Sequence, residues 1–136
     1  MDLIELARQL GAEIQNTEAY TNMIVATNKA DADKDLQDAI GKFNLTRLTI
    51  NNEAQKEDRD EELIRTKNEE LRAIYAGIME NENMIAYNDA KTVLDNLVQR
   101  VTMIINMCAE GADPATADYD ASASCGGNCS SCAGCH

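Results

Sequence analysis

A regular apolar repeat near the carboxyl end of the chain constrains its fold more than any other feature. From residue 84 to residue 108, side chains recur at alternating spacings of three and four, as in a helix that lies along a partner helix. The repeat consists of Met84, Tyr87, Lys91, Leu94, Val98, Val101, Ile105 and Cys108, and it is widened by Leu97, Ile104 and Met107. It predicts one long helix, ended by Gly111 and Pro114, against a partner in the same chain or in another.

The preceding residues also follow helical spacing. The 136-residue chain has one proline and seven glycines, which favours helix over sheet. Four helices are predicted before residue 84. They run from a cap at Asp2 to about residue 14, from a cap at Thr17 to about 29, from about 33 to 56, and from a capping box at Asp58 to about 80. We therefore expect an all-α fold, an antiparallel helical hairpin or bundle of about five helices with long coiled-coil-like members.

The composition changes after Gly111. No lysine or arginine follows Arg100, and every serine lies at or beyond Ser122. These changes predict three parts: a helical domain over 1–111, a flexible linker over 112–124, and a cysteine-rich tail over 125–136.

Net charge and the first residues exclude several protein classes. The formal net charge of −12 argues against a direct grip on the nucleic acid backbone. The segment 1–5 carries acids where a signal peptide needs bases, and no apolar run reaches membrane-spanning length. We expect a cytoplasmic protein that meets protein partners and not a membrane. In that compartment, clustered cysteines more often bind metals or react in redox chemistry than form structural disulfides.

The tail holds four of the five cysteines and the only histidine. They follow the spacing C-x3-C-x2-C-x2-C-H, and they are Cys125, Cys129, Cys132, Cys135 and His136. Thiolates this close repel one another unless a cation, a cluster or a disulfide neutralises them. Small residues between them let a short backbone wrap tightly and direct its N–H groups at sulfur. The spacing predicts a metal or iron–sulfur ligand loop.

Three interpretations of this loop remain open. Three close thiolates from Cys129, Cys132 and Cys135, with Cys125 as the fourth, suit an iron–sulfur cluster. Zinc could take four thiolates, or three and the imidazole of His136, although zinc sites usually separate two cysteine pairs by a dozen residues or more. The third interpretation is a disordered tail of reduced thiols. The compact spacing favours iron–sulfur, and Cys108, in the apolar repeat, is predicted to be a core residue.

Catalytic machinery is scarce in the sequence. A single histidine excludes the H-E-x-x-H motif, and neither a Walker loop nor G-x-G-x-x-G is present. Glutamates are numerous, among them Glu61, Glu62, Glu69 and Glu70, but a solvated helix face explains them better than acid–base catalysis. We expect a protein that is not an enzyme.

A helical body followed by a tail that begins with C-x3-C resembles the YlbF/YmcA family of bacterial regulators. The resemblance covers about residues 1–110 as an overall pattern, and the tail is its more specific part. It implies an all-α protein that tends to dimerise and joins sister regulators in a complex that binds [4Fe–4S] clusters. It further implies modulation of RNase Y-dependent mRNA maturation, affecting competence, sporulation and biofilm formation. By resemblance, the four tail cysteines are the candidate cluster ligands. The alternative is a zinc-binding or thiol redox-sensing protein that acts through its own tail.

Overall fold

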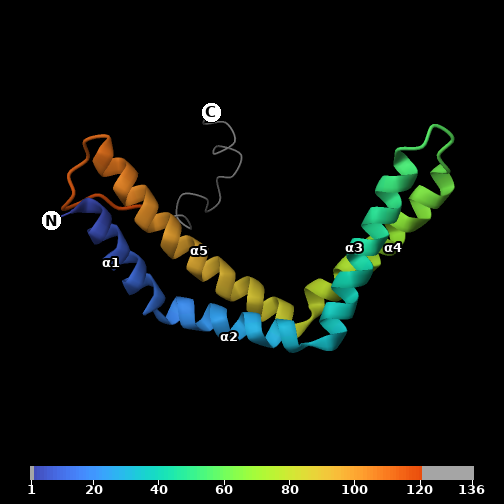
Figure 1. The fold of residues 1–136 in the computed structure, drawn as a ribbon, viewed down its shortest axis with the longest axis horizontal. Coiled ribbons are helices and arrows are strands. Elements are labelled where there is room, and N and C mark those ends of the chain that lie inside the picture. Colours follow the sequence, from blue (N-terminus) through green and yellow to red (C-terminus); the bar gives the residue numbers. More distant parts are fainter. Residues whose placement is uncertain (1, 121–136) are drawn as a thin grey trace. The chain divides into compact units, whose positions relative to one another are not determined.

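Residues 2–120 are described by a computed structural model, and within them the chain forms five α-helices and no strand (Figure 1). The helices are α1 (Leu3–Gln15), α2 (Glu18–Ala32), α3 (Lys34–Ala54), α4 (Glu61–Glu80) and α5 (Glu82–Ala109). The predicted all-α fold of about five helices is confirmed. None of these five helices is both long and apolar enough to cross a membrane. The chain forms two compact units, and the boundary between them falls within α5, between Ala90 and Lys91.

Side-chain caps fix the starts of the first four helices. The predicted caps Asp2 and Thr17 are confirmed, and Asp33 caps α3. Each side chain accepts a hydrogen bond from a backbone N–H of the first turn. The cap of α4 differs from the prediction. Asp60, and not Asp58, accepts from the N–H of Leu63 at 3.1 Å, so Glu61 is the first helical residue.

Helices α3 and α4 pack against each other as the predicted hairpin. The covered face of α3 passes through Ile40, Phe43 and Thr46, whereas Arg47 is exposed. The guanidinium of Arg47 instead lies 6.0 Å from the centre of the Phe43 ring. A heptad continued from Ile40 and Phe43 would place Arg47 on the covered face. Thr46, one residue before Arg47, takes the buried position instead.

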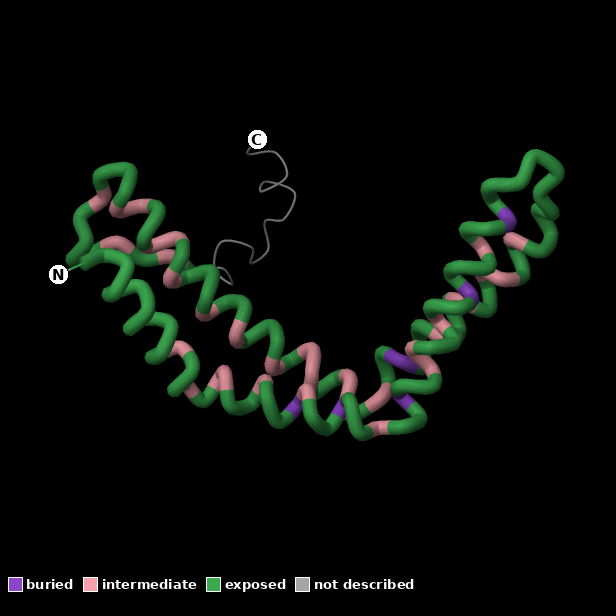
Figure 2. The backbone as a smooth tube through the Cα atoms, in the orientation of Figure 1, coloured by how far each residue is buried: buried purple, intermediate pink, exposed green. Residues whose placement is uncertain are grey.

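The best-buried cluster lies where the hairpin meets its neighbouring helices. Leu36 is 2% exposed and packs with Ala30 of α2 and Ile78 of α4. Met84 and Tyr87, from the first turns of α5, pack against this cluster. Figure 2 shows how few other positions along the described chain are fully buried.

A polar joint, made of Asp33, Asn81 and Asn83, lies at the same end of the α3–α4 hairpin as this cluster. Asp33 is the only residue between α2 and α3, and Asn81 is the only one between α4 and α5. The Asp33 carboxylate accepts hydrogen bonds from the side-chain amides of Asn81 and Asn83 at 3.0 and 2.9 Å. The side-chain oxygen Oδ1 of Asn81 in turn caps α5 by accepting a hydrogen bond from the N–H of Met84. The joint thus connects two one-residue junctions that are far apart in sequence.

At the far end of the hairpin, Glu53 closes the connecting loop. Its residue is 8% exposed, and its carboxylate accepts from the N–H of Asp60 at 3.1 Å. The Lys56 ammonium lies 2.7 Å from the other carboxylate oxygen. The hydrogen bond from Lys56 and then that from Asp60 lower the pKa of Glu53, which keeps this carboxylate charged.

Candidate functional site

The predicted ligands lie beyond the part of the chain that the structure describes. These ligands are Cys125, Cys129, Cys132, Cys135 and His136. Within residues 2–120, no three or more His, Cys, Asp or Glu side chains gather where they could hold a metal ion. Cys108 is described, as a half-buried free thiol in α5. The cysteine ligand set therefore stays a prediction.

The structure does define how the chain leaves α5 toward the tail. Gly111 has a φ of 102°, a left-handed conformation that glycine adopts without steric cost. The N–H of Gly111 donates to the carbonyl of Cys108 and the N–H of Ala112 to that of Met107, each at 3.0 Å. This pair of bonds is a Schellman motif, which satisfies the last carbonyls of the helix. The predicted end of α5 at Gly111 is confirmed.

Beyond Gly111 the chain turns and comes back along α5. Asp113 organises the turn, since its side chain accepts from the N–H of Ala115 and its carbonyl from that of Ala117. Asp118 then receives two hydrogen bonds of 2.7 Å from the Arg100 guanidinium, 18 positions earlier. We call this pair the Arg100–Asp118 clamp. Arg100 lies about 16 Å before Gly111 along the helix axis, so residues 112–118 run antiparallel to α5.

The clamp is a bidentate, charge-assisted contact at the surface. The Arg100 guanidinium, followed by the N–H of Tyr119, lowers the pKa of the Asp118 carboxyl. The same contact raises the pKa of Arg100. Both side chains are about half exposed, so salt screens the attraction. The sequence offered one signal, because Arg100 is the last cation and acids follow it, but that stretch was interpreted as a linker.

The apolar repeat on α5 is only partly covered. Along the second unit Leu94, Val101 and Cys108 are half-buried, whereas Val98 and Ile105 are exposed. Leu97, Ile104 and Met107 are half-buried as well. The covered stripe thus keeps the repeat positions Leu94, Val101 and Cys108 and passes between them through Leu97 and Ile104. The predicted coiled-coil partner for Val98 and Ile105 stays a prediction.

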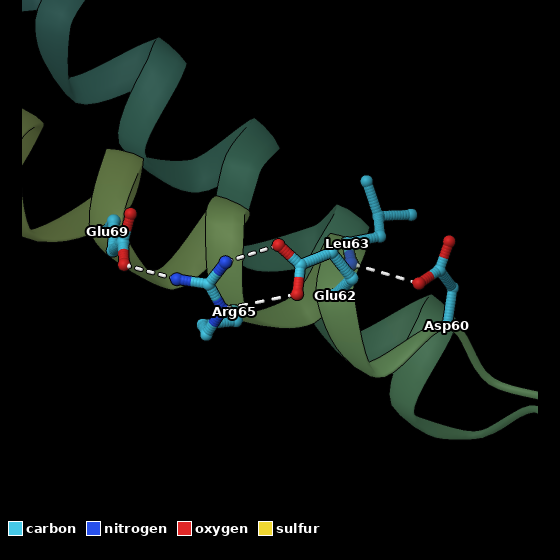
Figure 3. A network of polar contacts seen from close by, with 5 residues as sticks. All are labelled: Asp60, Glu62, Leu63, Arg65 and Glu69. Atoms are coloured by element: carbon cyan, nitrogen blue, oxygen red, sulfur yellow. Dashed lines mark hydrogen bonds and ion pairs between the residues drawn. The ribbon is translucent and has the colours of Figure 1, made fainter.

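The glutamates of α4 form an exposed, ion-paired face. Figure 3 shows Arg65 between Glu62 and Glu69, whose carboxylates both accept from its guanidinium. Glu70 pairs with Lys67 at 2.9 Å, and Glu61 with Arg59. All four glutamates predicted to be solvated are exposed, which agrees with that interpretation.

Comparison with known proteins gives one match. A protein-family model described as "Control of competence regulator ComK, YlbF/YmcA" matches residues 3–107, which include α1 to α4 and nearly all of α5. No curated protein and no solved structure matches the chain.

Proposed function

Because the chain belongs to the YlbF/YmcA family, we propose that it is a regulatory adaptor that carries an iron–sulfur cluster on its tail. The family model is described as controlling the competence regulator ComK. The family membership supports a regulatory role. The observation that carries the cluster is the group of four cysteines between residues 125 and 135, beyond the matched region, at the spacing C-x3-C-x2-C-x2-C.

The proposed cofactor is a [4Fe–4S] cluster ligated by Cys125, Cys129, Cys132 and Cys135. Four thiolates are the usual ligand number of such a cluster, and cysteines two or three residues apart are typical of the ligand runs in ferredoxins. The residues between them leave backbone N–H groups available to sulfur. His136 is a further candidate ligand if the metal is zinc, which is the alternative cofactor.

The proposed partners are sister regulators and, through them, RNase Y, in the cytoplasm. A net charge of −12 disfavours direct contact with mRNA, so an effect on mRNA maturation would pass through a protein partner. The described helices support an adaptor role, because their surface carries many exposed apolar side chains, among them Leu3, Val93 and Ile105. The exposed, ion-paired glutamates of α4 give no indication of catalysis.

A series of substitutions tests the cluster. The full chain is purified without oxygen, and its absorption spectrum and its iron, sulfide and zinc contents are measured. Cys129→Ser and Cys132→Ser should lose the brown chromophore, because serine is a harder and far less acidic ligand than cysteine. Cys125→Ser and Cys135→Ser should lose some or all of it.

Two variants serve as controls in the same series. Cys108→Ser changes the half-buried thiol in α5, and His136→Ala removes the imidazole, so both should keep the chromophore. Stoichiometric zinc without iron or sulfide in the anaerobic wild-type protein would contradict the cluster and favour the zinc or thiol sensor.

A further inference from the structure

The segment that follows α5 turns back along one side of that helix (Figure 1). It leaves the helix at Gly111 and is held at Arg100 by the Arg100–Asp118 clamp. Ile104 and Met107 lie between these two points on the same side, because the four positions from 100 to 111 are spaced by four, three and four residues. The returning segment therefore passes over two large apolar side chains of α5.

We call residues 112–119 the strap, and Ile104 and Met107 the covered pair. Both members of the covered pair are half-buried, and so are three side chains of the strap, which are Ala112, Ala117 and Tyr119. The adjacent residue Ile105 is turned about 100° from Ile104 around the helix and is 55% exposed. At this level α5 is thus half-buried on the side along which the strap lies, and the strap keeps two apolar side chains from water.

The strap is held on α5 by a contact that can break without unfolding the helix. The Arg100 and Asp118 side chains of the clamp are 55% and 53% exposed, and exposed ion pairs are weak and screened by salt. Within the strap, the hydrogen bonds that Asp113 accepts are local and do not depend on α5. The Schellman motif at Gly111 satisfies the end of the helix, so the strap can open at the clamp while α5 stays intact.

We propose that the strap is an autoinhibitory cover, which conceals the covered pair from a protein partner and opens when the clamp is released. Once the strap is open, Ile104 and Met107 add to the exposed side chain of Ile105, and a larger apolar patch is the kind of surface that proteins bind. The opening does not depend on the proposed cluster, because no strap residue is a predicted ligand.

The strap itself indicates the chemistry of that partner. It presents the Asp118 carboxylate between two half-buried apolar side chains, those of Ala117 and Tyr119. A partner that displaces the strap has to fill the same places, so we expect a segment with a carboxylate between apolar residues. Its carboxylate takes the guanidinium N–H groups of Arg100 that now donate to Asp118, in the same bidentate geometry.

Two substitutions on opposite sides of the clamp test the cover in the full chain. Asp118→Ala and Arg100→Gln each remove one half of the ion pair, so both should release the strap. Carbenes from a photolysed diazirine label exposed side chains, and mass spectrometry locates the label residue by residue. Labelling of the covered pair should rise severalfold in both variants, and that of Ile105 should change little. Glu110→Ala is the matched control, because Glu110 is also an exposed acid near the end of α5 but is not part of the clamp.

Salt and a double variant show whether one contact is responsible. Concentrated sodium chloride should raise labelling of the covered pair in wild type, but not in Asp118→Ala or Arg100→Gln, where the ion pair is already broken. The double variant should be labelled no more than either single variant, since both changes remove the same interaction.

A synthetic peptide of residues 112–120 tests the partner chemistry. Added to the Asp118→Ala chain, it should reduce labelling of the covered pair, whereas the same peptide with alanine in place of Asp118 should not. If both peptides protect the pair equally, or neither does, the expected partner chemistry is wrong.

Three results would overturn the cover itself. Labelling of the covered pair could stay unchanged in both variants although hydrogen exchange shows that the strap is released. Wild type at low salt could already be labelled as strongly as Asp118→Ala. Helical circular dichroism could be lost in both variants, in which case the clamp supports α5 and does not simply hold a strap.

Discussion

At the scale of single residues, Asp33 holds two helix junctions together. Its backbone ends α2, one carboxylate oxygen caps α3 through Leu36, and the other accepts from two asparagine amides. These hydrogen bonds, the one from Asn81 first, lower the pKa of Asp33 from its ordinary value of 3.8. A group with a lowered pKa in the folded state stabilises the fold above its ordinary pKa and loses that effect as the pH falls through the lowered value.

The pH dependence of an Asp33→Asn variant follows from this sign. Asparagine can still cap α3, but its amide nitrogen cannot accept from Asn81 and Asn83. The variant should melt at a lower temperature than wild type at pH 7. This difference in melting temperature should narrow below about pH 3.8, as Asp33 of the wild type becomes protonated. Thermal unfolding from pH 7 to pH 2.5 measures this difference. The control is Asp31→Asn, which changes an exposed aspartate near Asp33. An unchanged difference at all pH values would show that the carboxylate charge is not what the joint uses.

At the scale of helices, local sequence patterns predicted the features that depend on residues within one helix, which are its cap and its apolar stripe. Polar residues directly before apolar stripes predicted the caps Asp2 and Thr17, and the apolar spacing predicted five helices. Asp60 was missed because two aspartates in a row of charges offer equal caps. The joint and the clamp were missed since their partners lie 48 and 18 positions apart, where no local pattern reaches.

In the candidate site, too, local features could be predicted from the sequence and long-range contacts could not. Cysteine spacing is a local pattern, so the ligand set could be predicted from the sequence alone, and it stays a prediction. The return of residues 112–120 along α5 depends on one arginine meeting one of several acids, which only the folded arrangement specifies.

Removing the clamp should release the returning segment without unfolding α5. Asp118→Ala should increase hydrogen exchange at the amides of residues 115–119, while the melting temperature changes little, because exposed ion pairs add little stability. The charge-reversed pair Arg100→Asp with Asp118→Arg should restore much of the protection. If exchange is equally slow in Asp118→Ala, some other contact holds this segment.

At the scale of the whole molecule, the described chain keeps much of its apolar surface in contact with water. Its fully buried side chains are Ala26, Ala30, Leu36, Thr46, Glu53 and Ile78. A small core provides little stability on its own, so covering exposed faces of α1 and α5 by association should add to it.

Stability should therefore depend on protein concentration. For a dimer that is more stable than its separated chains, mass action raises the melting temperature as the concentration increases. We expect a rise of several degrees for wild type over a hundredfold range of concentration, and a smaller rise for Leu6→Asp. A wild-type melting temperature that is constant over this range would mean that each chain folds without help from another.

The one-residue junctions at Asp33 and Asn81 also fix how the helix after each junction is rotated about its own axis. Each residue of a helix advances the next by about 100°, so one inserted residue at either junction would turn the following helix by that angle and move its apolar stripe away from Leu36. The loop between Ala54 and Glu61 is longer, so a residue added between Lys56 and Asp60 can be accommodated while the Glu53–Asp60 hydrogen bond and the Asp60 cap of α4 are kept. Insertions for labels or fused domains therefore belong in that loop, and the two junctions tolerate no change in length.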